Sequence, residues 1–187
     1  PSSYSQPLSI ASVEKADSID SCYLTVGERK VAFNDTVEDK TVENVKDESP
    51  SFRSLASKGS LDYVVVPGFG EAKDYEDLDV SGKIALVSRG SSSFPDKQAA
   101  AQAAGAIGIV VYNNASGMLN MQINDGGDNI PAVFVSKADG EYMKAQFAEG
   151  VKTLTCCNGD LVQVKRDLTL SDFSSWGVTP DLKLKPE

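Results

Sequence analysis

The stretch DLDVSGKIALVSRGSSSFPDKQAAAQAAGAIGIVVYNN, residues 77–114, decides the fold. Its apolar run at residues 84–87 follows a glycine turn and predicts a buried strand. Ser93 is a favourable helix N-cap, the Ala- and Gln-rich segment after it has high helix propensity, and Gly105 is a typical helix stop. A second apolar run follows at once, at residues 107–112. Strand, helix and strand in this short span predict a βαβ unit with parallel strands and a right-handed crossover.

A similar order of elements returns downstream. Residues 132–135 are an apolar strand, Ser136 caps a helix expected over residues 137–148, and residues 153–156 predict another strand. Both helices are amphipathic in the manner of helices that cover a sheet or an open barrel. We therefore expect an α/β (α+β) fold, an open β-barrel or sheet built from βαβ units with two or three flanking helices.

Upstream of the first unit the strand signals are shorter. Residues 22–26 and 30–33 are apolar segments on either side of a glycine-containing turn, and they predict a β-hairpin. Residues 34–50 are strongly acidic and polar, which indicates an exposed strand or loop. A short helix is expected at residues 51–58 and a strand at residues 63–66.

The composition restricts the class of protein. The chain has 187 residues, of which 41% are hydrophobic, enough for one globular domain with its own core. Its net charge of -9 disfavours nucleic acid and anionic membrane surfaces as partners. No stretch approaches the roughly 20 apolar residues that a membrane-spanning helix needs, so no membrane insertion is expected.

The sequence contains no histidine, which bears on catalysis. Without an imidazole, a Ser-His-Asp or Cys-His triad cannot be assembled from this sequence. The three cysteines, Cys22, Cys156 and Cys157, show no CxxC spacing and are interpreted as buried thiols, while a bridge from Cys22 to one of the others stays open. The segment DGGDN at residues 125–129 lacks EF-hand spacing and favours a polar turn over a calcium site. We therefore expect no catalytic residue, no metal site and no cofactor.

Two parts of the sequence resemble the protease-associated (PA) domain. In residues 77–114 the matching features are the GKIALV-RG strand, the F--K pair at Phe94 and Lys97, the AGA-G helix end and the strand that ends in YN. Residues 129–144, NIPAVFVSKADGEYMK, continue the match with an IPA-F segment. The resemblance implies the PA-domain fold for the centre of the chain.

The two ends of the chain resemble parts of subtilisin-like serine proteases. Residues 173–187, FSSWGVTPDLKLKPE, are similar to the segment just before the nucleophilic serine of that family, and residues 10–27 are similar to one of its core strands. The resemblance implies a flank from the subtilase catalytic core at residues 1–30, a PA insert at residues 31–165 and a second core flank at residues 166–187. It is to cell-envelope subtilases of Gram-positive bacteria, of the lactocepin or streptococcal complement-peptidase type.

In that family the catalytic Asp and His precede the PA insert and the Ser follows it, so the resemblance carries no catalytic residue onto this chain. It implies an extracellular, cell-wall-associated protease whose PA domain regulates substrate access or binds protein substrate beside the active site. The implied partners are the parent catalytic domain and a protein or peptide substrate. Two alternatives stay open: an element that braces or homodimerises the protease without touching substrate and, much less favoured, an independent enzyme with a Ser or Asp nucleophile.

Candidate contact residues lie where predicted strands end in loops, and they are Phe69, Arg89, Ser91, Phe94, Asn113 and Asn114. Phe69 stands between two glycines, so its ring is either presented on a turn or packed over the sheet. Arg89 suits a carboxylate clamp, or an internal ion pair with Asp77 or Asp79.

Three of the remaining candidates also allow two interpretations each. Phe94 is a contact residue or a core plug beneath the predicted helix. Asn113 and Asn114 suit recognition of a peptide backbone, or the turn-forming hydrogen bonds that are the commoner use of asparagine at the end of a strand.

Overall fold

The computed structural model describes residues 18–35, 51–119, 121–123, 129–157, 160–165, 177–178 and 184–185. The chain divides into two compact units, Ser21–Val162 and a smaller one made of Pro1–Asp20 with Gln163–Glu187. In the smaller unit, β10 (Gly177–Val178) and β11 (Leu184–Lys185) pair antiparallel. Where the two units adjoin in sequence, β1 (Ser18–Ser21) and β9 (Val162–Lys165) form a two-stranded sheet.

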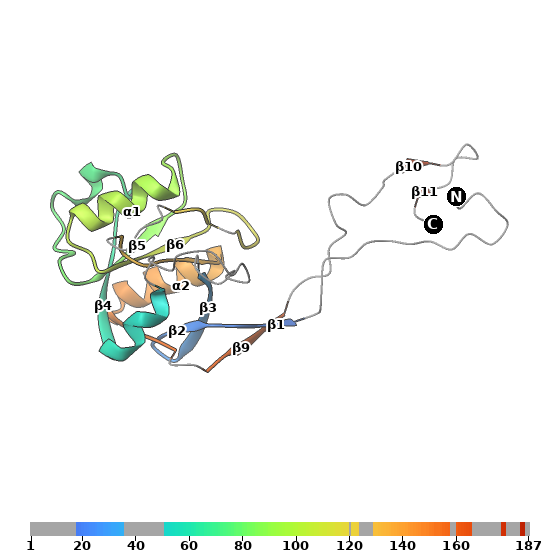
Figure 1. Cartoon of the computed structure of the whole chain (residues 1–187), viewed down its shortest axis with the longest axis horizontal. Helices are drawn as coiled ribbons and strands as arrows, with labels where there is room; N and C mark the ends of the chain where they lie inside the picture. Colours follow the sequence, from blue (N-terminus) through green and yellow to red (C-terminus); the bar gives the residue numbers. More distant parts are fainter. Residues whose placement is uncertain are drawn as a thin grey trace, which may run out of the picture. The chain divides into compact units, whose positions relative to one another are not determined.

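The larger unit is built on a closed seven-stranded barrel (Figure 1). Around the barrel the strands follow the order β2 (Tyr23–Val26), β3 (Arg29–Asp35), β7 (Ala132–Val135), β6 (Gly108–Tyr112), β5 (Ile84–Ser88), β4 (Ser60–Val65) and β8 (Thr153–Cys156). Strands β4, β5, β6 and β7 are parallel neighbours, whereas β8, β2 and β3 close the barrel through antiparallel pairs. The expected α/β class is therefore confirmed, with a barrel that is closed rather than open.

The parallel strands are buried on both faces. One face contributes Ile84, Leu86, Val110 and Val133 to the core inside the barrel. The other face contributes a second apolar cluster, which lies beneath helix α1 and includes Ala85, Val87, Ile109, Val111 and Phe134. Two-sided burial explains why these strands read as continuous apolar runs in the sequence rather than as alternating patterns.

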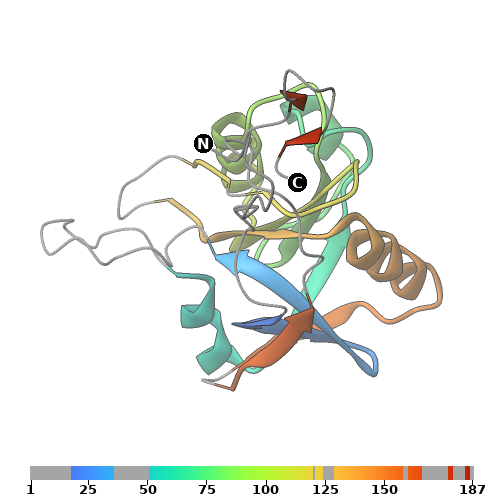
Figure 2. The same cartoon turned by 90° about the vertical axis from the view of Figure 1, so that its right-hand side faces the viewer.

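In the described part of the chain, four helical segments join the strands: α1 (Phe94–Ala103), α2 (Lys137–Ala148) and the short 3-10 helices η1 (Phe52–Lys58) and η2 (Ala72–Tyr75). Helix α1, drawn in green, and helix α2, drawn in orange, lie on different sides of the strands (Figure 2). Each α-helix begins directly after its predicted N-cap serine. The Oγ atoms of Ser93 and Ser136 accept the backbone N–H of the residue three positions later.

The two strand–helix–strand segments differ in topology. Strands β5 and β6 are adjacent and parallel, as predicted. The second segment was expected to resemble the first, but β7 and β8 are not neighbours, and β8 pairs antiparallel with β2 and β4. Closing the barrel requires a strand that bridges β2 and β4, so β8 runs there instead of beside β7.

The predicted hairpin is present. Strands β2 and β3 pair from Val26 and Arg29 outward around a two-residue turn, whose Gly27 has a φ of 57° that favours glycine. Strand β2 belongs to the barrel, so the barrel begins earlier in the chain than residue 31, inside the stretch 1–30 for which the resemblance implies a flank. The origin of the flanks stays a prediction, since residues 1–17 and 166–176 lie outside the described ones, as do residues 36–50 and 124–128.

The three cysteines, all of which the structure describes, are buried thiols rather than disulfides. The Sγ atom of Cys157 lies 3.5 Å from the Tyr23 backbone nitrogen, whose N–H it accepts. Among the described residues, no helix has the length and apolar character that crossing a membrane requires.

Tyr63 links the barrel to α2 and gives a test of the fold. Its hydroxyl donates to the Met143 carbonyl at 2.8 Å, and burial raises the pKa of Tyr63 from 10.0 to about 12. Because the folded pKa exceeds the unfolded one, the contribution of Tyr63 to stability is complete below pH 10.0 and is lost as the pH rises towards 12.

We expect Tyr63→Phe to lower the free energy of unfolding at neutral pH by about 1 kcal/mol, because the Met143 carbonyl loses a buried donor. Urea unfolding at a series of pH values should also show a shallower loss of stability above pH 10 than in the wild type. Tyr23→Phe, which removes the hydroxyl of a tyrosine on β2, is the control. Equal alkaline slopes in Tyr63→Phe and the wild type would contradict this account.

Candidate functional site

The candidate residues gather at one edge of the barrel. Because β4, β5 and β6 are parallel neighbours, the loops that follow them, residues 66–71, 89–93 and 113–119, emerge at the same edge. The carboxyl ends of parallel strands are where ligands bind in open α/β sheets. We call Phe69, Arg89, Asn114 and Met118 the carboxyl-edge surface.

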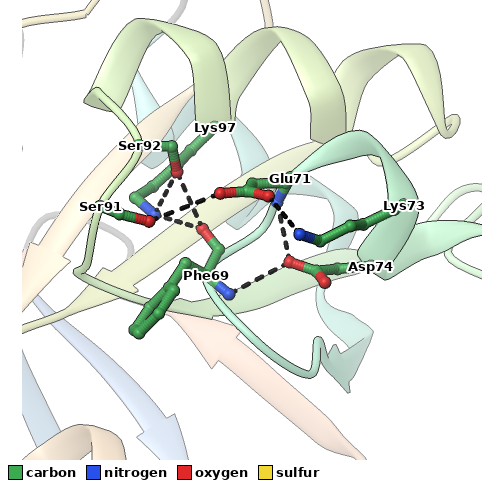
Figure 3. A network of polar contacts seen from close by, with 7 residues as sticks. All are labelled: Phe69, Glu71, Lys73, Asp74, Ser91, Ser92 and Lys97. Carbon is green, nitrogen blue, oxygen red and sulfur yellow. Dashed lines mark hydrogen bonds and ion pairs between the residues drawn. The ribbon is translucent and has the colours of Figure 1, made fainter.

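Phe69 is held by its backbone while its ring stays partly exposed. Its N–H donates to Asp74 Oδ2 at 3.1 Å, and its carbonyl accepts from Ser92 Oγ at 3.3 Å and from Lys97 Nζ (Figure 3). The ring packs against Gly90, and Phe69 as a residue is still 44% exposed. The ring therefore stands on a turn, as one of the two expectations has it, and it covers the loop residue Gly90 rather than the sheet.

The flanking glycines allow this loop conformation. Gly68 and Gly70 have φ angles of 66° and 74°, which side chains other than glycine rarely adopt. Gly70 also lies so close to the barrel that a Cβ atom there would be 2.4 Å from Val87 Cγ1. Asp74 completes the loop by accepting the Glu71 N–H at 2.9 Å.

Lys97 is a site residue that the sequence analysis recognised only as part of a family motif. Its side chain is fully buried, on the same face of α1 as Gln98 and Ala101. Nζ donates to the Phe69 carbonyl and to Ser92 Oγ at 2.8 Å. Burial lowers the pKa of Lys97, and the nearby charges of Glu71 and Asp74 oppose that shift. A lysine on the face of a helix turned towards the sheet was the signal available in the sequence.

Arg89 does not form the ion pair that was one of its two expected roles. Asp79 pairs with Lys83 at 2.7 Å, and among the described residues no carboxylate lies within ion-pair distance of Arg89. Instead the guanidinium donates from one nitrogen to Asn113 Oδ1 at 3.2 Å. The half-buried Arg89 therefore keeps further N–H donors beside an apolar surface.

Asn113 organises the loop after β6 and is buried. Its Oδ1 accepts from Arg89 and from the Ala115 N–H, and its Nδ2 donates to the Gly117 carbonyl at 2.8 Å. These are the turn-forming hydrogen bonds considered as the alternative role. The neighbouring Asn114 is exposed and remains available for contact.

Phe94, Ser91 and Met118 have different environments from one another. Phe94 packs edge-on against Phe134, with ring centroids 6.0 Å apart, and belongs to the cluster beneath α1 rather than to the surface. Ser91 is exposed and donates to Glu71 Oε1 at 3.4 Å. Met118, which the sequence analysis missed, is 37% exposed directly after Gly117. Nothing in its local sequence distinguishes it from a core methionine.

The surface offers apolar contact, one cation and amide groups. Within the described part of the chain, no group of three His, Cys, Asp or Glu side chains is placed to hold a metal ion. Phe69 and Met118 are two of the three exposed large apolar side chains among the described residues, and Arg89 stands on the loop between theirs. Such an arrangement is suited to binding a polypeptide segment.

Gly90 provides a direct test of how Phe69 is placed. A Cβ atom at Gly90 would lie 2.0 Å from Phe69 Cδ1, so Gly90→Ala must displace the ring. Because the ring is already partly exposed, we expect a stability loss of no more than about 1 kcal/mol. With 4-fluorophenylalanine at position 69, the fluorine NMR signal should shift in Gly90→Ala and stay in place in the control Ser91→Ala. An unchanged signal in Gly90→Ala would show that the ring does not rest on Gly90.

Comparison with known proteins identifies the centre of the chain. The family model of the PA domain matches residues 57–143, so a PA domain is present and contains all six candidate residues. The chain is 40% identical over 127 residues to the minor extracellular protease Vpr of Bacillus subtilis, covering 66% of this chain and 15% of that protein. It is 33% identical over 158 residues to the C5a peptidase of Streptococcus pyogenes serotype M3, covering 83% of this chain and 13% of that protein.

Among solved structures, a zinc aminopeptidase from Bacillus subtilis matches with a TM-score of 0.53 and 22% identity, covering 86% of this chain and 35% of that one. This likeness shows a shared fold. The chain therefore has protease relatives, of whose length it spans 15% and 13%, and its fold recurs in a zinc aminopeptidase.

Proposed function

We propose that this chain is the non-catalytic PA domain of an extracellular subtilisin-like serine endopeptidase, and that its carboxyl-edge surface binds protein substrate beside the active site. One observation carries the proposal: Phe69 and Met118 are exposed on loops that follow β4 and β6, and Arg89, on the loop between them, has no ionic partner among the described residues. Aromatic and arginine side chains are the commonest anchors of protein interfaces.

The relatives support the proposed parent protease. The matches to Vpr and to the C5a peptidase, over 127 and 158 residues, are longer than the stretch 57–143 that the PA model matches, and Vpr is an extracellular protease. On this proposal residues 1–30 and 166–187 contain pieces of the catalytic core, and the catalytic Asp, His and Ser belong to the parent protein. Lactocepin-type architecture and attachment to a Gram-positive cell wall are parts of the same proposal.

Binding without catalysis is a sufficient role for such a domain. Binding energy from parts of a substrate far from the scissile bond can be used to raise the specificity of a protease. An extended segment of substrate with apolar side chains and a carboxylate would match Phe69, Met118 and the spare donors of Arg89. The surface would then select or orient protein substrates before cleavage.

We expect the purified chain to bind members of an array of short peptides in which acidic and apolar positions are varied. Phe69→Ala and Arg89→Gln should each weaken binding by about tenfold, the usual effect of removing an interface anchor. Leu161→Ala removes the third exposed apolar side chain, which lies outside the carboxyl-edge surface, and is the matched control. Fluorescence anisotropy of the best peptide gives the dissociation constants.

Two outcomes would contradict the proposal. Wild-type affinity in both surface variants would exclude these residues from binding. If no peptide binds, while sedimentation velocity shows that Phe69→Ala or Arg89→Gln changes the oligomeric state, the surface serves assembly of the protease instead.

A further inference from the structure

Phe69 would be a poor anchor if its loop were free to move. It is flanked by Gly68 and Gly70, and glycine is the residue whose backbone is least restricted. Ordering a flexible anchor during association lowers affinity, since the lost conformational entropy is subtracted from the contact energy. The loop must therefore be fixed in advance by something other than its own backbone preferences.

Polar contacts fix both peptide groups of Phe69. On one side Asp74 accepts the N–H groups of Phe69 and Glu71 through a single oxygen, at 3.1 and 2.9 Å. On the other side Lys97 and Ser92 donate to the Phe69 carbonyl, and Lys97 also donates to Ser92 (Figure 3). Asp74 belongs to the segment just after the loop, whereas Lys97 reaches it from helix α1.

Stability alone does not account for a buried ammonium at this position. Lysine is almost never fully buried unless it is paired, and the described hydrogen-bond acceptors of Lys97 are two neutral oxygens. The carboxylates of Glu71 and Asp74 act on it from beyond ion-pair distance. An apolar side chain of similar length would fill the same space without the cost of desolvating a charge.

The ammonium of Lys97 instead fixes the orientation of the Phe69 residue. Nζ donates to the carbonyl of Phe69 and lies 5.8 Å from the centroid of its ring. The Lys97 side chain therefore holds the Phe69 peptide and also occupies the space beside the Phe69 ring. Gly90 lies against the ring itself. The exposed part of the ring is then presented in a single orientation.

We infer that Lys97 is a positioning residue of the carboxyl-edge surface, which holds the Phe69 peptide so that the Phe69 ring is preorganised to receive an apolar side chain of a bound polypeptide. The positioning part follows from the contacts within this chain, and the identity of the partner group rests on the proposed function. Lys97 itself is buried and does not touch the partner.

The positioning is tested without any ligand, by amide hydrogen exchange of the full chain. In Lys97→Met we expect the Phe69 and Glu71 amides to exchange about 10- to 100-fold faster, the loss that corresponds to one hydrogen bond from a charged group. The Ala104 amide, which is bonded within α1, should keep its rate and report that the fold is intact. Lys83→Met removes a lysine from the exposed pair with Asp79 and is the control variant.

A second variant covers the case in which Lys97→Met does not fold. Ser92→Ala removes one donor to the Phe69 carbonyl and one acceptor of Lys97, so it should speed exchange of the Phe69 amide by a smaller factor. Unchanged exchange at Phe69 and Glu71 in a folded Lys97→Met, or in Ser92→Ala if that is the variant measured, overturns the inference.

A double-mutant cycle with the best peptide from the array tests the link to binding. Lys97→Met should weaken peptide binding by about tenfold in the wild-type background and have no effect in the Phe69→Ala background, because the lysine acts through the ring. Equal losses in both backgrounds mean a merely structural role and refute the inference. If no peptide binds the wild type, the proposed function fails while the exchange experiment still decides whether Lys97 positions Phe69.

Discussion

Burial of the parallel strands on both of their faces is the constraint on which the rest of this structure depends. Strand β5 places Ile84 and Leu86 inside the barrel and Ala85 and Val87 beneath α1, so no face of it is left for solvent. Such a strand cannot carry polar side chains along its length. The strands therefore leave exposed polar and functional groups to the loops at their ends, which is where the carboxyl-edge surface lies.

The same constraint explains why buried polar side chains at that edge bond to the backbone. Loops that fold back onto an apolar barrel bring peptide groups into places that water reaches poorly, and each unpaired group there would cost about 1–3 kcal/mol. Asn113 satisfies the loop after β6 through Gly117 and Ala115, and Lys97 satisfies the loop after β4 through the Phe69 carbonyl. These residues stabilise loop shape, and shape in turn decides which side chains reach the surface.

The sequence allowed the local elements to be predicted because their signals are local. Serine caps at Ser93 and Ser136 and the glycine turn at Gly27 each depend on a few neighbouring residues. The antiparallel placement of β8 could not be predicted, since it depends on pairing with β2, more than a hundred residues away in the chain. Individual helix and strand signals contain no information about closure of a barrel.

The same difference between local and long-range signals separates the features of the candidate site that could be predicted from those that could not. Phe69, Arg89 and Asn114 were found because strand ends followed by loops are visible in a sequence. Three features could not be found in this way, because each depends on a loop from another strand. They are the acceptor of Arg89, the burial of Lys97 and the exposure of Met118.

Side chains that hold a loop and the exposed side chains proposed to contact a partner are distinct groups in this domain, and this separation has a consequence for how the proposed binding could change. The contact side chains stand on loops whose shape is set by Asn113, Asp74 and Lys97, none of which needs to touch a partner. Substitution of an exposed position such as Asn114 or Met118 would alter what is recognised and leave the loop bonds in place. Substitution of a holding residue would weaken every contact at once, whatever the partner. On the proposed function, specificity and affinity are therefore controlled by different residues of the same edge.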